Sequence, residues 1–140
     1  MPRKPSAVFT DKELAIMQVV WQLGEATVKD IQQRLPGNQH YNSVLTIIRV
    51  LERKGHLVHR AEGRTFFYRP EETKERARTR LLRHLVDQVF GGSAASVVLN
   101  LVEAGDLSKK DLDEIRRKIA AQQPAALSRP ARRSKDAGNK

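Results

Sequence analysis

The chain has 140 residues and no cysteine, and its 26 Lys and Arg side chains against 16 Asp and Glu side chains give a formal net charge of +10 at pH 7. This length allows one modest core or two small units and excludes large barrel and doubly wound enzyme folds, while the lack of cysteine excludes disulfide bonds, thiolate nucleophiles and Cys-based metal sites. The positive charge makes a polyanion the first partner to consider.

Three helices are predicted before residue 56, because apolar residues recur there every three or four positions. They cover about 10–23, 27–35 and 41–54, and a glycine or a Pro-Gly pair follows each of them. The first begins with a capping box, in which the side chains of Thr10 and Glu13 each bond the backbone N–H of the other residue. The inward positions are Leu14, Met17, Val20, Trp21, Val28, Ile31, Leu35, Val44, Ile47, Ile48 and Leu51.

A β-hairpin is predicted next, because the apolar period changes to two. Its strands cover 57–61 and 64–69, and Gly63 supplies the positive φ that the turn needs. Alternation places Phe66 and Tyr68 on one face, and we expect both side chains to lie in the core.

The order helix, short helix, helix, hairpin is that of a winged helix-turn-helix domain, in which the third helix enters the DNA major groove. The outward side chains of the helix at 41–54 are mostly short, polar or cationic, as that groove requires. We therefore expect DNA contacts from Asn42, Ser43, Leu45, Thr46, Arg49 and Arg53, and from Arg64 at the tip of the wing. A solvated helix face and a solvated hairpin arginine are the alternatives.

The charge of the ordered part of the chain is concentrated on the same elements. Residues 42–69 hold six basic and two acidic side chains, whereas 10–41 and 70–128 are each within one charge of neutral. A local excess of cations is the electrostatic footprint of a nucleic-acid interface. The charge pattern and the helical pattern thus point to the same surface.

Three more helices are predicted after residue 70, with Gly91-Gly92 ending the first and a capping box of Ser108 and Asp111 starting the last. Their apolar faces exceed what about 50 residues bury alone, which favours a homodimer over packing within a monomer. We expect the interface to contain Leu81, Leu85, Val89, Val97, Leu101, Leu112 and Ile115.

Together these elements predict a mostly α fold with a small β-hairpin wing. A winged helix-turn-helix domain is expected at 10–70 and a helical dimerisation domain of three helices at 71–120. A basic leader at 1–9 and a basic tail at 121–140 lack an apolar period and are predicted to be disordered. No apolar run approaches the ~20 residues of a membrane helix and the start lacks the apolar stretch of a signal peptide, so we expect a cytoplasmic protein with no direct membrane binding.

Catalytic and metal chemistry are not expected. No catalytic or phosphate-binding motif occurs, so the chain is not predicted to be an enzyme or to hold a metal or other cofactor. His56 and His59 straddle the start of a strand and point to opposite faces, which argues against a shared metal. Arg76, Arg80 and Arg83 form one side of a later helix, either as phosphate contacts or, more simply, as a solvated face.

Four segments resemble the penicillinase repressor family of Bla/Mec-type transcriptional regulators. They lie at 14–21, 42–55, 63–70 and 96–108, and the last, with Val-Leu-Asn-Leu-Val-Glu followed by Asp-Leu-Ser, is the most specific. The resemblance covers about residues 8–120. It implies a homodimeric repressor whose winged helices bind the two halves of a palindromic DNA operator.

The resemblance also implies that repression is relieved by proteolysis. In the best-known members a membrane sensor protease, triggered by a β-lactam, leads to cleavage after an Asn in the dimerisation helix and before a Phe. The matching pair here is Asn100-Leu101, with Leu in place of Phe. A sensor protease that acts on the C-terminal domain is therefore an expected partner.

A second function stays open on the residues alone. A winged-helix module can bind protein or RNA through the same basic surface without sequence-specific DNA binding. The side chains of Phe67 and Leu45, which the pattern leaves exposed, would suit such a partner. Sequence-dependent binding to a DNA duplex separates the two functions.

Overall fold

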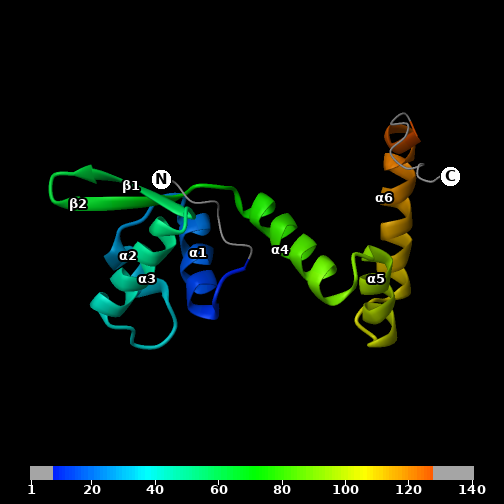
Figure 1. Cartoon of the computed structure of the whole chain (residues 1–140), viewed down its shortest axis with the longest axis horizontal. Coiled ribbons are helices and arrows are strands. Elements are labelled where there is room, and N and C mark those ends of the chain that lie inside the picture. Colours follow the sequence, from blue (N-terminus) through cyan, green and yellow to red (C-terminus); the bar gives the residue numbers. More distant parts are fainter. Residues whose placement is uncertain (1–7, 128–140) are drawn as a thin grey trace. The chain divides into compact units, whose positions relative to one another are not determined.

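The computed structural model of the chain describes residues 8–127, and its side chains as far as residue 122 (Figure 1). Within this part the chain forms helices and one two-stranded antiparallel sheet, which confirms the mostly α fold with a hairpin. It divides into two compact units, one ending at Gly92 and the other beginning at Ser93. Apart from 8–9 and 121–127, the leader and tail that the sequence predicts to be disordered lie outside the described residues.

The first unit carries the elements expected of a winged helix. Its helices are α1 (Asp11–Leu23), α2 (Val28–Arg34), α3 (Tyr41–Arg53) and α4 (Lys74–Val89), and its strands are β1 (Leu57–Glu62) and β2 (Thr65–Pro70). The helix starts follow from local chemistry: Thr10 Oγ1 accepts from the N–H of Glu13 at 3.1 Å, while Glu13 Oε1 accepts from the N–H of Thr10 at 2.9 Å. Thr27 and Asp30 form the same capping box ahead of α2. α4 belongs to this unit, whereas the sequence groups it with the helices that follow.

The hairpin is joined to the helices by a backbone bridge that the sequence did not predict. The two strands pair from Leu57 opposite Pro70 to Glu62 opposite Thr65. Beyond them, the N–H of Ala26 donates to the carbonyl of Tyr68 at 2.9 Å, and the N–H of Tyr68 donates to the carbonyl of Ala26 at 2.8 Å. The loop between α1 and α2 thus acts as a one-residue third strand on the outer edge of β2.

One continuous core lies between α1, α2, α3 and the base of the hairpin. It consists of Ile16, Met17, Val19, Val20, Ala26, Val28, Ile31, Val44, Ile48, Leu51, Leu57 and Tyr68. Tyr68 is buried as expected, but Phe66 is 44% exposed, so its assignment to the core is wrong. Phe66 pairs with Ala61 close to the turn, where the hairpin projects past α2 and α3 (Figure 1). The alternation is correct there, but an open groove separates this part of the hairpin from α2 and α3, so no helix covers the ring.

The start of α4 is fixed to the first unit by an aromatic cluster. Phe9 meets Trp21 edge-on at 6.2 Å between ring centroids and lies 4.5 Å from the ring of His56. The Arg80 guanidinium lies over the Phe9 ring and pairs with Glu72. Trp21 Nε1 donates to the backbone carbonyl of Glu72 at 3.1 Å. Phe9, the last residue of the predicted basic leader, is therefore a packing residue.

The second unit contains α5 (Ala94–Glu103) and α6 (Lys109–Leu127). Ser93 caps α5 and Ser108 forms a capping box with Asp111 ahead of α6, where that bonding lowers the pKa of the Asp111 carboxyl. No residue of α5 is buried. The α6 helix continues past residue 120, where the sequence predicts a disordered tail, and the alanines of this stretch are strong helix formers.

No single helix within the described residues is both long and apolar enough to cross a membrane, although α4 and α5 taken together reach that length and composition.

Candidate nucleic-acid interface

The outer face of α3 is exposed along its whole length. Val44, Ile48 and Leu51 turn into the core, which leaves the polar positions on the opposite side. Of the side chains proposed for DNA contact, Asn42, Ser43, Thr46, Arg49 and Arg53 are exposed on α3, Arg64 is exposed at the hairpin turn, and Leu45 is partly buried against the core. The surface that the sequence predicted is therefore accessible, with Leu45 at its inner edge.

A groove of about 410 Å³ separates this face of α3 from the hairpin. Three cations line it, Lys29 from α2, Arg49 from α3 and Arg64 from the hairpin turn, and no acidic side chain among residues 8–122 lines it. The aromatic rings of Tyr41 and Phe66 complete its walls, and they are 48% and 44% exposed. A concave surface lined by charges of one sign focuses the electrostatic field and attracts a polyanion.

Sequence reasoning missed three of these groove residues. Lys29 belongs to the short second helix, Tyr41 is the first residue of α3, and the sequence pattern indicates no binding role for either. Phe66 is the third, because strand alternation predicts it in the core. The capping box at Thr27 fixes Lys29 near the start of α2, but only the three-dimensional arrangement of the helices brings that position to the groove.

Two of the six cations in residues 42–69 are bound to acidic side chains of the protein. Lys54 Nζ lies 2.8 Å from Glu13 Oε2. Burial acts to raise the pKa of Glu13, but the hydrogen bonds from Lys54 and from the backbone of Thr10 outweigh it and lower that pKa. Arg60 is held by Glu25 and Glu62. The other four, Arg49, Arg53, Arg64 and Arg69, form no ion pair with any residue in the part of the chain that the structure describes.

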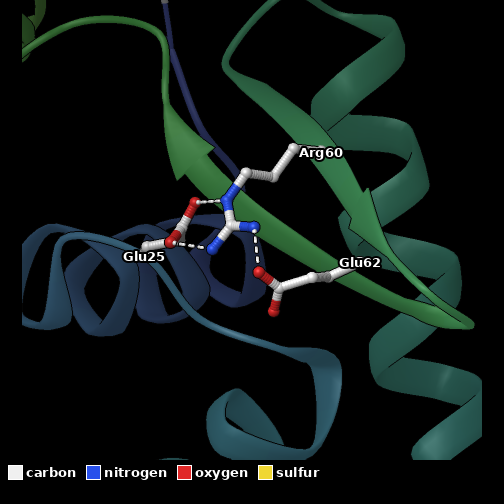
Figure 2. Close-up of polar contacts among 3 residues, drawn as sticks. All are labelled: Glu25, Arg60 and Glu62. Carbon is white, nitrogen blue, oxygen red and sulfur yellow. Dashed lines mark hydrogen bonds and ion pairs between the residues drawn. The ribbon is translucent and has the colours of Figure 1, made fainter.

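Figure 2 shows how Arg60 is held. Its Nε and Nη2 donate to the two carboxylate oxygens of Glu25 at 2.8 and 2.9 Å, and its Nη1 donates to Glu62 at 3.2 Å. These hydrogen bonds raise the pKa of Arg60, and the same guanidinium lowers the pKa of the Glu25 carboxyl. The Arg60 guanidinium also covers the ring of Phe67 at 4.5 Å. Arg60 therefore ties β1 to the loop before α2 and offers no free charge to a ligand.

A second contact ties the hairpin to α3. His59 Nδ1 of β1 lies 2.5 Å from Glu52 Oε2 of α3. The His59 ring stacks on Phe66 with 4.2 Å between centroids and 16° between planes. His56, in contrast, is buried beside Phe9, so the two histidines contact different rings. Its burial lowers the pKa of the His56 side chain. Residues 8–127 contain no group of three or more side chains placed to hold a metal ion.

The residues proposed for other roles lie outside this groove. Arg80 is partly buried and pairs with Glu72, whereas Arg76 and Arg83 are exposed on α4. Asn100 is exposed within α5. Among the proposed dimerisation residues, Leu85, Val89 and Leu101 are exposed, and Leu81, Val97, Leu112 and Ile115 are partly covered.

The family model and the sequence relatives agree on one family. The family model described as "Penicillinase repressor" matches residues 9–121. The penicillinase repressor of Bacillus licheniformis is 26% identical over 109 residues, which span 76% of this chain and 85% of that protein. The methicillin resistance regulatory protein MecI of Staphylococcus aureus (strain N315) is 24% identical over 110 residues, 77% of this chain and 89% of that protein. The protein in the solution structure of the DNA binding domain of the repressor BlaI is 28% identical, with a TM-score of 0.47. The match covers 53% of this chain and 90% of that chain.

Proposed function

The chain belongs to the penicillinase repressor family, whose members are transcriptional repressors and not enzymes, and from this premise we propose that it represses transcription as a homodimer bound to a palindromic DNA operator. The observation that carries DNA binding is the groove between α3 and the hairpin wing, which is lined by Lys29, Arg49 and Arg64 and, within the part of the chain that the structure describes, by no acidic side chain. The names of the relatives supply the repressor role.

The geometry of the groove supports two kinds of DNA contact. α3 presents a row of small polar side chains with Arg49 among them, and an arginine in the major groove donates two hydrogen bonds to one guanine. Arg64 extends from the turn of the wing, where it suits a phosphate or a minor-groove contact. In this proposal Arg49 specifies the sequence and Arg64 positions the domain.

Sequence-dependent binding with a steep inverse dependence on salt is the test of this function. A genomic footprint supplies the candidate operator, and gel shifts compare it with a shuffled duplex of the same length. The operator should bind more tightly by at least three orders of magnitude at matched salt. Equal affinity for the two duplexes would refute sequence-specific repression.

Exposed apolar side chains on the C-terminal helices support the homodimer. Leu82, Val89, Leu99 and Ile119 are 54%, 64%, 60% and 57% exposed in the single chain. Isolated side chains of this kind are common on protein surfaces, but such a density on consecutive helices is typical of an interface. Analytical ultracentrifugation should find a dimer, and replacing Val89 and Leu101 with aspartate should give a folded monomer with weaker operator binding.

We also propose that cleavage between Asn100 and Leu101 relieves repression. The pair lies in α5, a ten-residue helix with no buried residue in the single chain, and a helix this short is marginal whenever the packing of a partner subunit is lost. Local unwinding therefore gives a protease access to the extended chain that it needs. After cell-wall stress, mass spectrometry should detect a fragment that ends at Asn100, whereas an intact repressor that still releases its operator would refute this route.

The alternative function, a module that binds protein or RNA, finds less support on this surface. Phe67 is half-buried under the guanidinium of Arg60, so the expectation that it is exposed is wrong. Leu45 packs partly against the core. Neither side chain offers the free apolar surface that would suit such a partner.

A further inference from the structure

Phe66 is an exposed aromatic ring inside a cationic groove. It is 44% exposed, although strand alternation places it on the same face as buried Tyr68. It lines the groove together with Arg49 and Arg64. A ring that is 44% exposed forgoes part of the stabilisation that burial gives, and aromatic side chains together with arginine are enriched on surfaces that become covered on binding.

The ring of Phe66 is also held in one orientation. His59 stacks against one face at 4.2 Å and is itself fixed by the 2.5 Å contact between His59 Nδ1 and Glu52 Oε2. Because Glu52 belongs to α3, the helix that faces the major groove also sets the position of the ring. A side chain fixed before binding loses little rotamer entropy when it is covered.

We propose that Phe66 contacts DNA, with its exposed surface packed against deoxyribose carbons of the backbone strand that passes through the groove. The inference rests on the proposed function and adds an apolar contact to it. A DNA backbone alternates charged phosphates with apolar sugar faces, so a groove that combines arginines with one exposed ring matches both kinds of surface. Glu52 and His59 are positioning residues in this arrangement, since they act through Phe66.

The salt dependence of binding distinguishes an apolar contact from an ionic one. A phosphate contact contributes to the slope of log affinity against log salt concentration, because it releases counterions, whereas a sugar contact releases none. Phe66→Ala should therefore weaken binding by about tenfold at every salt concentration and leave the slope unchanged. Phe66→Leu, which keeps apolar surface at the same place, should recover part of the affinity.

The measurement is fluorescence anisotropy with a labelled duplex that carries the footprinted site, and with a shuffled duplex as a second probe. Phe67→Ala is the matched control, because Phe67 lies on the other face of β2 beneath Arg60 and should leave affinity unchanged. His59→Ala should weaken binding in the wild-type background and have no further effect in the Phe66→Ala background.

Each result decides the proposal. Parallel losses on both duplexes, with equal salt slopes, establish a sugar contact. A loss confined to the footprinted duplex assigns Phe66 to a base edge and overturns the sugar contact, and an equal loss for Phe67→Ala shows that the hairpin itself is damaged and overturns it too. If the wild type binds neither duplex, the proposed function fails, whereas a binding wild type with an unaffected Phe66→Ala variant refutes only the role of Phe66.

Discussion

Replacing Arg64 with alanine, and separately Arg60, tests the proposal that Arg64 binds phosphate whereas Arg60 holds the fold. Both belong to the hairpin and both are exposed. Arg60 is occupied by Glu25 and Glu62, whereas Arg64 forms no ion pair with any residue that the structure describes. We therefore expect only the Arg64→Ala variant to release fewer counterions when it binds DNA.

The size of the effect depends on how many phosphates the Arg64 side chains neutralise. Each phosphate contact contributes about 0.9 to the slope of log affinity against log salt concentration, and the proposed homodimer carries two copies of Arg64, so the slope should decrease by about 1.8. The ratio of the wild-type affinity to that of the Arg64→Ala variant should then be about tenfold larger at about 50 mM salt than at about 200 mM.

Anisotropy titrations over that salt range measure the slope, and circular dichroism confirms that each variant is folded. Arg60→Ala should keep the wild-type slope and should melt at a lower temperature, because it removes the bonds between β1 and the loop before α2. The reasoning is refuted by a wild-type slope for Arg64→Ala, or by a slope for Arg60→Ala that decreases as much.

Three further predictions concern base reading, the core and pH. Arg49→Ala should cost about 1–3 kcal/mol of binding and relax base preference at one operator position, and a binding-site selection with unchanged preference would make Arg49 a phosphate contact. Ile48→Ala, at a fully buried position, should lower the free energy of unfolding in urea by about 2–5 kcal/mol, and a loss well below that range would contradict the core described here. Burial lowers the pKa of His56 below its ordinary 6.5, so the unfolded chain binds the proton at a higher pH and the free energy of unfolding should fall as the pH drops below 6.5. His56→Leu should flatten this dependence between about pH 7 and pH 5, and equal pH profiles for the variant and the wild type would refute the assignment.

The features that the sequence predicted correctly are those set by short-range chemistry. The capping boxes at Thr10 and Ser108 join residues three positions apart, so the sequence shows both partners at once. The turn at Gly63 has φ +63°, which favours glycine and makes the hairpin visible in the same way. Helix periodicity likewise predicted that the polar face of α3 lies outward, because the buried positions of α3 recur every three or four residues along the sequence.

The features that it did not predict depend on contacts between distant residues. Glu25 and Arg60 lie 35 positions apart, and nothing in the local pattern of either one indicates the pair that removes Arg60 from the cationic surface. Phe9 packs on Trp21 and His56 only after the chain has folded. The exposure of Phe66 depends on the groove that separates α3 from the hairpin, which periodicity does not encode.

The backbone bridge between Ala26 and Tyr68 bears on the kinetics of binding. A hairpin with both edges free fluctuates, and binding would then have to wait for it to order. With one edge secured to the loop before α2, the wing is already in place when the protein meets DNA, so the helix and the wing engage in one step. An uncharged substitution in the groove, such as Phe66→Ala, should therefore act mainly on the lifetime of the complex, through its dissociation rate, and leave the association rate close to that of the wild type.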